Sequence, residues 1–327
     1  MQISPPPYLR TGLTVQKRMY FTLLALLPVI AAAVYFYGYR ALLIVITSVV
    51  TAMLMDYLVK RMRGRPFVMD GSAPLIGILL ALTLPPNVAL WMVVVGVVFA
   101  IGVVKETAGG LGHYVFSPVM ASRVFMELSF GARLIDGARV FGSDMGSWAK
   151  PTGWAGALEN ADTPLTATSK TAIDGAVEWT TNRFDMLMGN TPGSIGETSA
   201  LIILICGLVL IAFRIIDWRF PLSFIGSVAV LSFAFQTNPM DHLLVGGLML
   251  AAFFIITDTV TSPVTRNGKI IVGIGCALFT LMIREWGDAR EGVYYAVLLM
   301  NALVPLLDRF IKTRPFGFRK EAEIKDA

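Results

Sequence analysis

The sequence predicts an all-α integral membrane protein with about ten transmembrane helices. Its 327 residues are 55% apolar and only 15% charged, with a mean hydropathy of +0.68, and a soluble domain carries more charge than this. Apolar runs of about 17 to 22 residues recur, and such runs cross a hydrocarbon core at a rise of about 1.5 Å per residue. Lysines and arginines gather in alternate loops, as in multi-pass membrane proteins.

The expected membrane segments follow one another along the chain at residues 19–37, 40–59, 72–84, 88–104, 114–130, 198–214, 219–236, 241–257, 269–284 and 291–311. The third segment is short and ends at "LPPN", so we expect a half-helix there. The fifth contains Pro118 and Arg123, so we expect it to be broken or to lie beside a cavity.

The distribution of basic residues orients these segments. If the N-terminus is cytoplasmic, the inner loops and the tail carry most cations, including Arg18, Lys60, Arg61, Arg63, Arg65, Lys105, Arg214, Arg219, Arg266 and Lys269, whereas the short outer turns carry chiefly Arg40, Arg284 and Arg290. This positive-inside pattern predicts that both termini are cytoplasmic and that residues 131–197 lie outside.

The long outer loop divides the chain into two sets of about five segments, which would then run through the membrane in opposite directions. We therefore expect a cytoplasmic N-terminal segment (1–18), a first repeat (19–130), an extracytoplasmic loop (131–197), a second, inverted repeat (198–311) and a cytoplasmic tail (312–327). Short echoes favour an internal repeat: "GSAPLIGILLAL" resembles "ETSALIILICGL", and "SPV" occurs at 117–119 and 262–264. Broken helices that meet near the bilayer midplane are a common way to build a transport site.

Three polar clusters interrupt or adjoin the apolar segments. They are "MDGSAPL", with Asp70, Gly71 and Ser72; "GNTPGSIGETSAL", with Gly193, Ser194, Glu197 and Thr198; and "TDTVTSPVTRNGK", with Asp258. One interpretation is helix capping, in which hydroxyl and carboxylate oxygens accept the free amides of a starting helix. The other is that exposed amides at a positive helix end hold an anion or the edge of a flavin ring. The sequence leaves both interpretations open.

Acidic residues in or beside apolar segments are candidates for ion binding, because burial of a carboxylate is costly. They are Asp56, Asp70, Glu106, Glu127, Asp258 and Glu285, of which Asp70 and Asp258 adjoin the polar clusters. The two cysteines, Cys206 and Cys276, lack the spacing of a metal or iron–sulfur motif, so we expect no metal site. The net charge of +5 fits cytoplasmic loops rather than nucleic-acid binding.

Five stretches together carry a family resemblance, namely "DGSAPLIGILLALTLPP", "GGLGHYVFSPVMASRVF", "GNTPGSIGETSALIILI", "TDTVTSPVTRNGKIIVGIG" and "IREWGDAREGVYYAVLLMN". From about residue 8 to residue 317 the chain resembles the D subunit of the Rnf complex. A more distant likeness is to the B subunit of the sodium-translocating NADH:quinone oxidoreductase. The resemblance implies a multi-pass protein of the prokaryotic cytoplasmic (inner) membrane.

Members of this family carry FMN joined through its phosphate to a threonine, usually within D-x-x-[ST]-x-A-T followed by Pro-Leu. The stretch "DTPLTAT" fits this context without a gap and makes Thr168 the preferred acceptor, with Asp162 at its start. Leu165 stands where the family has a hydroxyl residue, and Ser169-Lys170 replace Pro-Leu. A second register makes Thr163 the acceptor but puts Asp162 where alanine is expected.

The resemblance further implies an electron relay between ferredoxin and NAD, which bind other subunits, coupled to translocation of Na⁺ or H⁺. The implied partners are Rnf subunits A, B, C, E and G, especially the flavinylated G subunit, together with membrane lipid and no nucleic acid. Relatives also hold a second, non-covalent flavin such as riboflavin. Two alternatives remain: a flavin-free channel or transporter with an inverted repeat, and a purely structural scaffold subunit.

Overall fold

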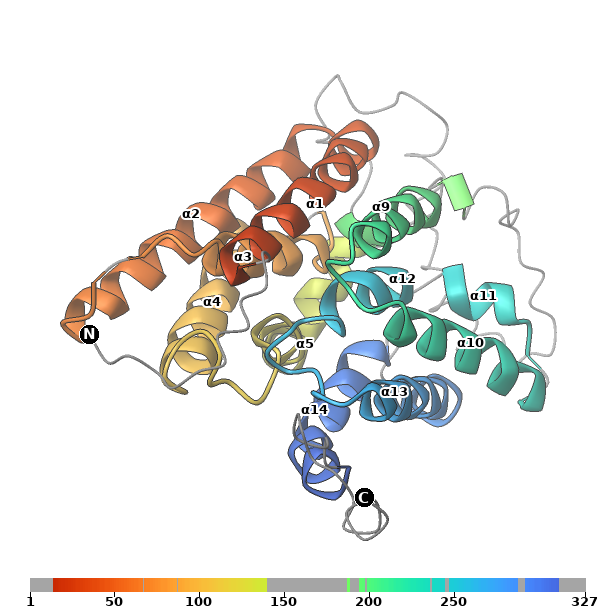
Figure 1. Cartoon of the computed structure of the whole chain (residues 1–327). Helices are drawn as coiled ribbons and strands as arrows, with labels where there is room; N and C mark the ends of the chain where they lie inside the picture. Colours follow the sequence, from red (N-terminus) through yellow and green to blue (C-terminus); the bar gives the residue numbers. More distant parts are fainter. Residues whose placement is uncertain are drawn as a thin grey trace, which may run out of the picture.

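The protein is described here from a computed structural model that covers residues 14–66, 68–86, 88–139, 187–188, 194–197, 199–235, 237–244, 247–287 and 292–311. Every regular element in these ranges is a helix (Figure 1). The elements are α1 (Val15–Tyr37), α2 (Tyr39–Met62), α3 (Ser72–Leu82), α4 (Leu90–Val98), η1 (Phe99–Glu106), α5 (Pro118–Arg139), η2 (Ile195–Glu197), α9 (Ala200–Ala212), α10 (Arg219–Ala234), α11 (Pro239–Leu244), α12 (Leu248–Leu250), η3 (Ala251–Ile255), α13 (Arg266–Trp286) and α14 (Val293–Phe310).

Four of these helices, α1, α2, α13 and α14, are long and apolar enough to cross a membrane. Three further apolar helices, α3, α9 and α10, are shorter. Large apolar side chains such as Leu24, Val50 and Val230 are more than half exposed on the surface of the bundle, which is the arrangement that a lipid environment stabilises. The predicted all-helical fold is confirmed for the described residues, and its helices are those of a membrane protein.

Helices of the N-terminal half pack through small residues. The hydroxyl of Ser48 in α2 donates to the carbonyl of Gly77 in α3 at 2.6 Å, and Ser122 in α5 makes the same 2.6 Å bond to Gly96 in α4. A Cβ atom at Gly96 would lie 2.3 Å from the Met126 sulfur. Close backbone approach of this kind is how helices gain packing energy where the surroundings are as apolar as the interface.

Helices of the C-terminal half follow the same rule. A Cβ atom at Gly273 in α13 would lie 2.0 Å from the Ser223 hydroxyl in α10, and one at Gly207 in α9 would lie 2.3 Å from the ring of Phe253 in η3. In Figure 1 the red-to-yellow helices lie to one side and the green-to-blue helices to the other. Helices α1 and α9 join the halves, with the rings of Phe21 and Phe213 stacked at 6.4 Å.

Two short helices begin at left-handed glycines. Helix α3 starts after Gly71 (φ 80°), and α12 starts after Gly247 (φ 64°) and continues into η3. The short third segment predicted before "LPPN" is therefore present as α3. The single segment predicted over 241–257 is wrong, because α11 ends at Leu244 and a new helix begins at Leu248. Glycine supplies the positive φ that this change of direction needs.

The fifth segment also differs from the prediction. Its helix begins at Pro118 rather than at residue 114 and is continuous through Arg123, and its non-helical residue is Phe130 (φ −130°, ψ 19°). Proline at the first helical position loses no hydrogen bond, since that N–H has no partner within the helix. Pro118 thus starts this helix instead of breaking it, and it lines a pocket, which is the other outcome that the sequence predicts for this segment.

Two stretches have π-helical hydrogen bonding. Residues Phe99–Glu106 of η1 continue α4, and residues Ala251–Ile255 of η3 continue α12. Such stretches are rare and cluster at functional sites. Each one here leads directly into a group of polar side chains, with Lys105 and Glu106 at the end of η1 and Thr257 and Asp258 just after η3.

Candidate functional site

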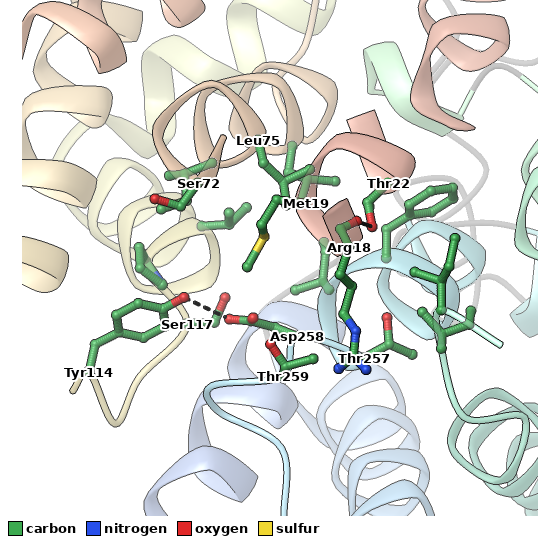
Figure 2. Close-up of a pocket in the computed structure, with 18 residues that line it drawn as sticks. Arg18, Met19, Thr22, Ser72, Leu75, Tyr114, Ser117, Thr257, Asp258 and Thr259 are labelled. Carbon is green, nitrogen blue, oxygen red and sulfur yellow. Dashed lines mark hydrogen bonds between the residues drawn. The ribbon is translucent and has the colours of Figure 1, made fainter. Parts of the chain in front are cut away.

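A pocket lies where the two halves meet, and it is called the central pocket below (Figure 2). Helices α1 and α3, the segment before α5, the α9–α10 turn and the end of η3 all contribute to it. Its lining comprises Arg18, Met19, Thr22, Ser72, Leu75, Ile76, Leu79, Tyr114, Ser117, Pro118, Val119, Ile215, Ile216, Phe254, Ile255, Thr257, Asp258 and Thr259. Segments far apart in the sequence therefore share one site.

The polar side of the central pocket is built around Asp258. The Tyr114 hydroxyl donates to Asp258 Oδ2 at 3.1 Å, and the amide of Val260 donates to Oδ1 at 3.3 Å. Burial raises the pKa of the Asp258 carboxyl, against the lowering effect of these hydrogen bonds. Figure 2 shows Tyr114 and Asp258 pointing toward one another with Ser117 beside them. The pair offers a carboxyl group to a ligand at the edge of an apolar space.

The opposite side of the central pocket is apolar. Met19 and Leu75 face the Tyr114–Asp258 pair across the space in Figure 2, and Phe254 and Ile255 are among the other apolar lining residues. Pockets for flat, mostly apolar ligands combine such walls with a few polar groups that fix orientation. The donor and acceptor groups match the polar edge of a flavin ring and the walls match its apolar edge, whereas the enclosed volume of about 50 Å³ is smaller than the ring, so lining side chains would have to move for it to enter.

A buried ionic cluster adjoins the central pocket through Ser72. The ammonium of Lys105, which is 1% exposed, lies 2.7 Å from Asp56 Oδ1 and donates to Ser72 Oγ at 2.8 Å. Lys60 lies 2.6 Å from the other Asp56 oxygen and 3.9 Å from Asp70. Buried charges persist only when they are paired and hydrogen-bonded in this way, so these groups fix the start of α3 against α2 and η1.

Glu106 extends this cluster. Its Oε1 atom accepts no hydrogen bond within the described residues and lies 4.0 Å from the Lys105 ammonium. Arg63 lies 4.0 Å from Oε2 and also donates to the backbone carbonyl of Glu106. The ionic cluster thus balances carboxylates with ammonium and guanidinium groups beneath the pocket.

A separate polar group surrounds the end of α3 and the start of α12. Arg123 donates to the carbonyl of Thr83 at 3.0 Å, pairs with Glu127 at 3.3 Å and lies 5.1 Å from the centre of the Tyr294 ring. On the neighbouring η2 turn, Glu197 Oε2 accepts from the amide of Ser194 at 3.4 Å. Arg123 is therefore paired with polar groups inside an otherwise apolar segment.

The predicted site residues do not all come together. Ser72 and Asp258 share the central pocket, and Asp70 lies just behind it, where its Oδ1 accepts both the amide of Ser72 at 3.0 Å and its hydroxyl at 2.7 Å. Gly71 supplies the left-handed turn before α3. Ser194 and Glu197 lie instead near the other end of α3, where the amide of Ile195 donates to the Leu84 carbonyl at 2.9 Å. Thr163, Thr168, Asp162, Gly193 and Thr198 lie outside the described residues.

Capping accounts for part of these motifs. Asp70 binds the first amide of α3, and Thr265 caps α13 by accepting from the amide of Gly268 at 3.1 Å. Asp258 caps no described helix and faces the pocket instead. Sequence reasoning missed Lys105, Tyr114 and Arg18 as parts of the site. A lysine at the end of an apolar segment is a signal for Lys105, whereas nothing in the sequence distinguishes Tyr114.

Comparison with known proteins covers nearly the whole chain. A family model described as "NQR2, RnfD, RnfE family" matches residues 2–317. The chain is 36% identical over 321 residues to the D subunit of the Na(+)-translocating ferredoxin:NAD(+) oxidoreductase complex of Acetobacterium woodii, covering 98% of this chain and 96% of that protein. It is 35% identical to the D subunit of the proton-translocating ferredoxin:NAD(+) oxidoreductase complex of Clostridium ljungdahlii, covering 97% and 96%.

A third relative, the D subunit of the ion-translocating oxidoreductase complex of Stutzerimonas stutzeri, is 39% identical over 330 residues, which cover 93% of this chain and 92% of that protein. These identities extend over full-length chains rather than over isolated motifs. The chain therefore belongs to the NQR2, RnfD, RnfE family, and its resemblance to the D subunit of the Rnf complex is confirmed.

Proposed function

We propose that this chain is the membrane electron-transfer subunit of an ion-translocating ferredoxin:NAD oxidoreductase complex, and that it carries covalent FMN. The observation that carries the proposal is the unbroken family match from residue 2 to residue 317, which includes the threonine-rich stretch 162–168. Full-length relatives at 35–39% identity are named as the D subunits of such complexes. The activity would belong to the assembled complex with subunits A, B, C, E and G.

Thr168 is the proposed attachment residue, with Thr163 as the alternative and Asp162 beside both. A bound flavin would supply one- and two-electron chemistry, while the protein holds it and tunes its surroundings. The threonine oxygen would serve as a tether, because a phosphoester bond keeps the carrier at a fixed place along the chain. The positive-inside pattern of the cytoplasmic loops supports an extracytoplasmic position for this loop.

Peptide mass spectrometry tests the attachment directly. Trypsin is expected to release residues 140–170 as one peptide, because Lys150 precedes proline and is not cleaved. We expect this peptide from the native complex to carry the mass of FMN less one water, and fragment ions to place the addition on Thr168. An addition on Thr163 selects the alternative register. An unmodified peptide from the matured native complex contradicts the proposal and leaves the transporter and scaffold alternatives.

The central pocket is the proposed site of the second, non-covalent flavin. Asp258, Tyr114 and Ser117 would contact its polar edge, and Met19 and Leu75 its apolar edge. Acid extraction of the purified complex, followed by chromatography, measures this flavin separately from the covalent one. We expect a Ser117→Phe variant, which fills the pocket, to lose the extractable flavin and to keep the covalent flavin.

Asp258 is the better candidate for cation coupling. A carboxylate beside a redox centre offers a place for the compensating cation, Na⁺ or H⁺. Asp258 lines the central pocket, with its oxygens accepting from Tyr114 and the Val260 amide, whereas Asp70 lies outside the lining, with Oδ1 accepting from Ser72 and Oδ2 3.9 Å from Lys60. An Asp258→Asn complex reconstituted in vesicles is expected to transfer electrons with reduced ion uptake. Unchanged uptake at unchanged electron flow excludes this role.

The membrane arrangement proposed with this function is two inverted repeats of about five helices that flank the outer loop. Its support is the pair of short helices α3 and α12–η3, each of which starts at a left-handed glycine in the third segment of its half. The echo between residues 71–82 and 197–208 does not add to this support, because it relates α3 to α9, the third segment to the first. Both termini would be cytoplasmic in the prokaryotic inner membrane.

A further inference from the structure

A second pocket adjoins the central pocket on the side that the positive-inside pattern predicts to be cytoplasmic, and it is called the basic pocket below. It is a cavity of about 490 Å³ formed by the α9–α10 turn, the segment after η3 and the first turns of α10 and α13. Its lining comprises Arg18, Ile211, Arg214, Ile215, Ile216, Asp217, Trp218, Arg219, Phe220, Thr257, Thr259, Ser262, Arg266 and Lys269. It shares Arg18, Ile215, Ile216, Thr257 and Thr259 with the central pocket, but the residues proposed to contact the flavin and the cation do not line it.

Charge is strongly unbalanced in the basic pocket. Five cations face a single carboxylate, Asp217, which lies 3.1 Å from Lys269 and 3.6 Å from Arg219. Burial raises the pKa of Asp217, but the Arg219 amide and Lys269 outweigh it and the net shift is downward, so this group is ionised at neutral pH. Arg18, Arg214 and Arg266 form no ion pair within the described part of the chain. Three guanidinium groups are therefore available to an anion.

The backbone adds to the positive electrostatic potential in the basic pocket. Helices α10 and α13 both begin at the basic pocket, at Arg219 and Arg266, and the positive end of a helix dipole favours anions. Thr257, Thr259 and Ser262 supply hydroxyl groups to the same cavity. Charge, dipoles and hydroxyl donors together match the several oxygens of a phosphate group.

Arg214 occupies its place at a conformational cost. It has a φ of 55°, and it is the one residue other than glycine with a positive φ among the described residues. It follows the C-cap of α9, where glycine or asparagine is usual. An arginine held in a left-handed conformation at the rim of a cationic cavity is an outlier that points to a function for its side chain.

The surroundings of the basic pocket are those of a membrane interface. Phe213 is 65% exposed, Trp218 is 51% exposed and Leu222 on the first turns of α10 is 61% exposed. Aromatic side chains gather at the level of lipid head groups. Basic pockets between transmembrane helices on the cytoplasmic side bind anionic head groups. Exposed apolar side chains at positions close to Arg214 and Arg219 in the chain are what acyl chains require and a soluble phosphate does not.

We propose that the basic pocket binds the phosphodiester group of an anionic phospholipid from the cytoplasmic leaflet. Arg18, Arg214 and Arg266 hold the phosphate oxygens, and the acyl chains lie along Phe213 and Leu222. The site is independent of the covalent flavin. A bound lipid would join α1, from the N-terminal half of the chain, to α9, α10 and α13, from the C-terminal half.

Native mass spectrometry of the purified full-length chain in detergent tests the site. Short-chain phosphatidylglycerol, phosphatidylcholine and inorganic phosphate are titrated separately. The test variant is Arg214→Asn/Arg266→Gln, in which asparagine suits the left-handed position. The control is Arg61→Gln/Arg309→Gln, which removes the same charge from exposed positions outside the pocket. A thermal midpoint measured for each variant checks that it is folded.

We expect phosphatidylglycerol to bind on the order of tenfold more tightly than phosphatidylcholine, and the test variant to weaken phosphatidylglycerol binding on the order of tenfold. The control variant should bind like the unmodified chain. Equal binding of the two lipids, or an equal loss in the control, overturns the proposal. Inorganic phosphate that binds as tightly as phosphatidylglycerol also overturns it and identifies the cavity as a free-phosphate site.

Discussion

At the scale of single residues, the buried charges decide which substitutions the folded chain tolerates. Lys105 is 1% exposed and Asp56 is 2% exposed, and the Lys105 ammonium lies 2.7 Å from Asp56 Oδ1. The Coulomb energy of such a pair is largely offset by its desolvation, so the intact pair adds little net stability. Removal of Lys105 is different, because it leaves the buried Asp56 carboxylate with one of its two ammonium partners, Lys60.

The variant Lys105→Met should lower the free energy of unfolding by about 3 kcal/mol. Asp56 would keep only Lys60 as a cationic partner, and Ser72 would lose a donor at the start of α3. The apparent thermal midpoint of the detergent-solubilised chain measures the effect. Lys60→Met is the matched control: its side chain is 13% exposed and retains access to water, so a smaller loss is expected. Equal losses would contradict the distinction between the two lysines.

The attachment residue gives a second prediction at this scale. Thr168→Val should abolish the flavin fluorescence of the denatured polypeptide on a gel, because valine has no oxygen to esterify. Thr163→Val should leave the fluorescence unchanged, and Thr171→Val serves as a control within the same loop. If only Thr163→Val removes the signal, the second register is right. If no single variant removes it, neither threonine is the acceptor.

The sequence could predict residues with a strong local signature but not their partners. Asp258 and Ser72 are predictable as site residues because each adjoins a polar interruption of an apolar segment, and both line the central pocket. Tyr114 and Arg18 are not, since their importance comes from chain crossings that bring α1 and the segment before α5 to Asp258. No periodicity in the sequence encodes such a contact.

At the scale of elements, the short helices depend on glycines that turn the chain. Gly247 starts α12 with a φ of 64°, and a Cβ atom there would lie 2.7 Å from the Tyr294 hydroxyl and 3.1 Å from Glu197 Oε1. Gly64 has almost the same φ, 63°, but nothing lies within 4 Å of its Cβ position. These two glycines therefore separate conformational strain from steric overlap.

Gly64→Ala should cost about 1 kcal/mol, the strain of a left-handed alanine. Gly247→Ala should cost that amount plus a further 1 to 3 kcal/mol, roughly, because the new methyl group overlaps side chains at the start of α12. Thermal midpoints of both variants in one detergent provide the measurement. A Gly247→Ala chain as stable as Gly64→Ala would mean that Tyr294 moves aside at no cost.

Element boundaries show where sequence reasoning ends. Nine of the ten predicted segments have one main helix, or a helix continued by a π-stretch, near the expected place. The remaining segment, 241–257, is wrong because its apolar pattern runs across Gly247 without a change in hydropathy, while the backbone turns there. Of the two outcomes expected for the segment with Pro118, a break or a neighbouring cavity, the structure has the cavity, since this proline stands at the first helical position and lines the central pocket. Composition locates apolar segments, whereas backbone geometry decides where each helix begins.

At the scale of the whole molecule, the charge pattern predicts which regions face the cytoplasm. In a Cys206→Ala/Cys276→Ala background, which removes both buried thiols, Ser143→Cys should react with a membrane-impermeant maleimide in intact spheroplasts. Lys325→Cys should react only after permeabilisation. The positive-inside distribution is the reason, because it places the long loop outside and the tail inside. The reverse labelling pattern would contradict the orientation.

The overall fold class was within reach of the sequence because hydropathy and charge are properties of the whole chain. The assembly of the central pocket was not, since it needs residues from α1, α3, the segment before α5 and the end of η3. The ligands proposed for the two pockets follow from the side chains that these separate segments bring together. The family model matches residues 2–317, so the match includes every residue that lines the two pockets.

The two π-helical stretches have a consequence for how this chain tolerates changes in length. A π turn holds about one residue more than an α turn, and one residue rotates everything after it by about 100°. Deleting a single residue within Phe99–Glu106 would let that stretch relax to ordinary helix, and the loss of the extra residue would leave Lys105 facing Asp56 much as before. An α-helical stretch holds no such extra residue, so the same deletion there would rotate everything beyond it and do more harm than most exchanges of side chain.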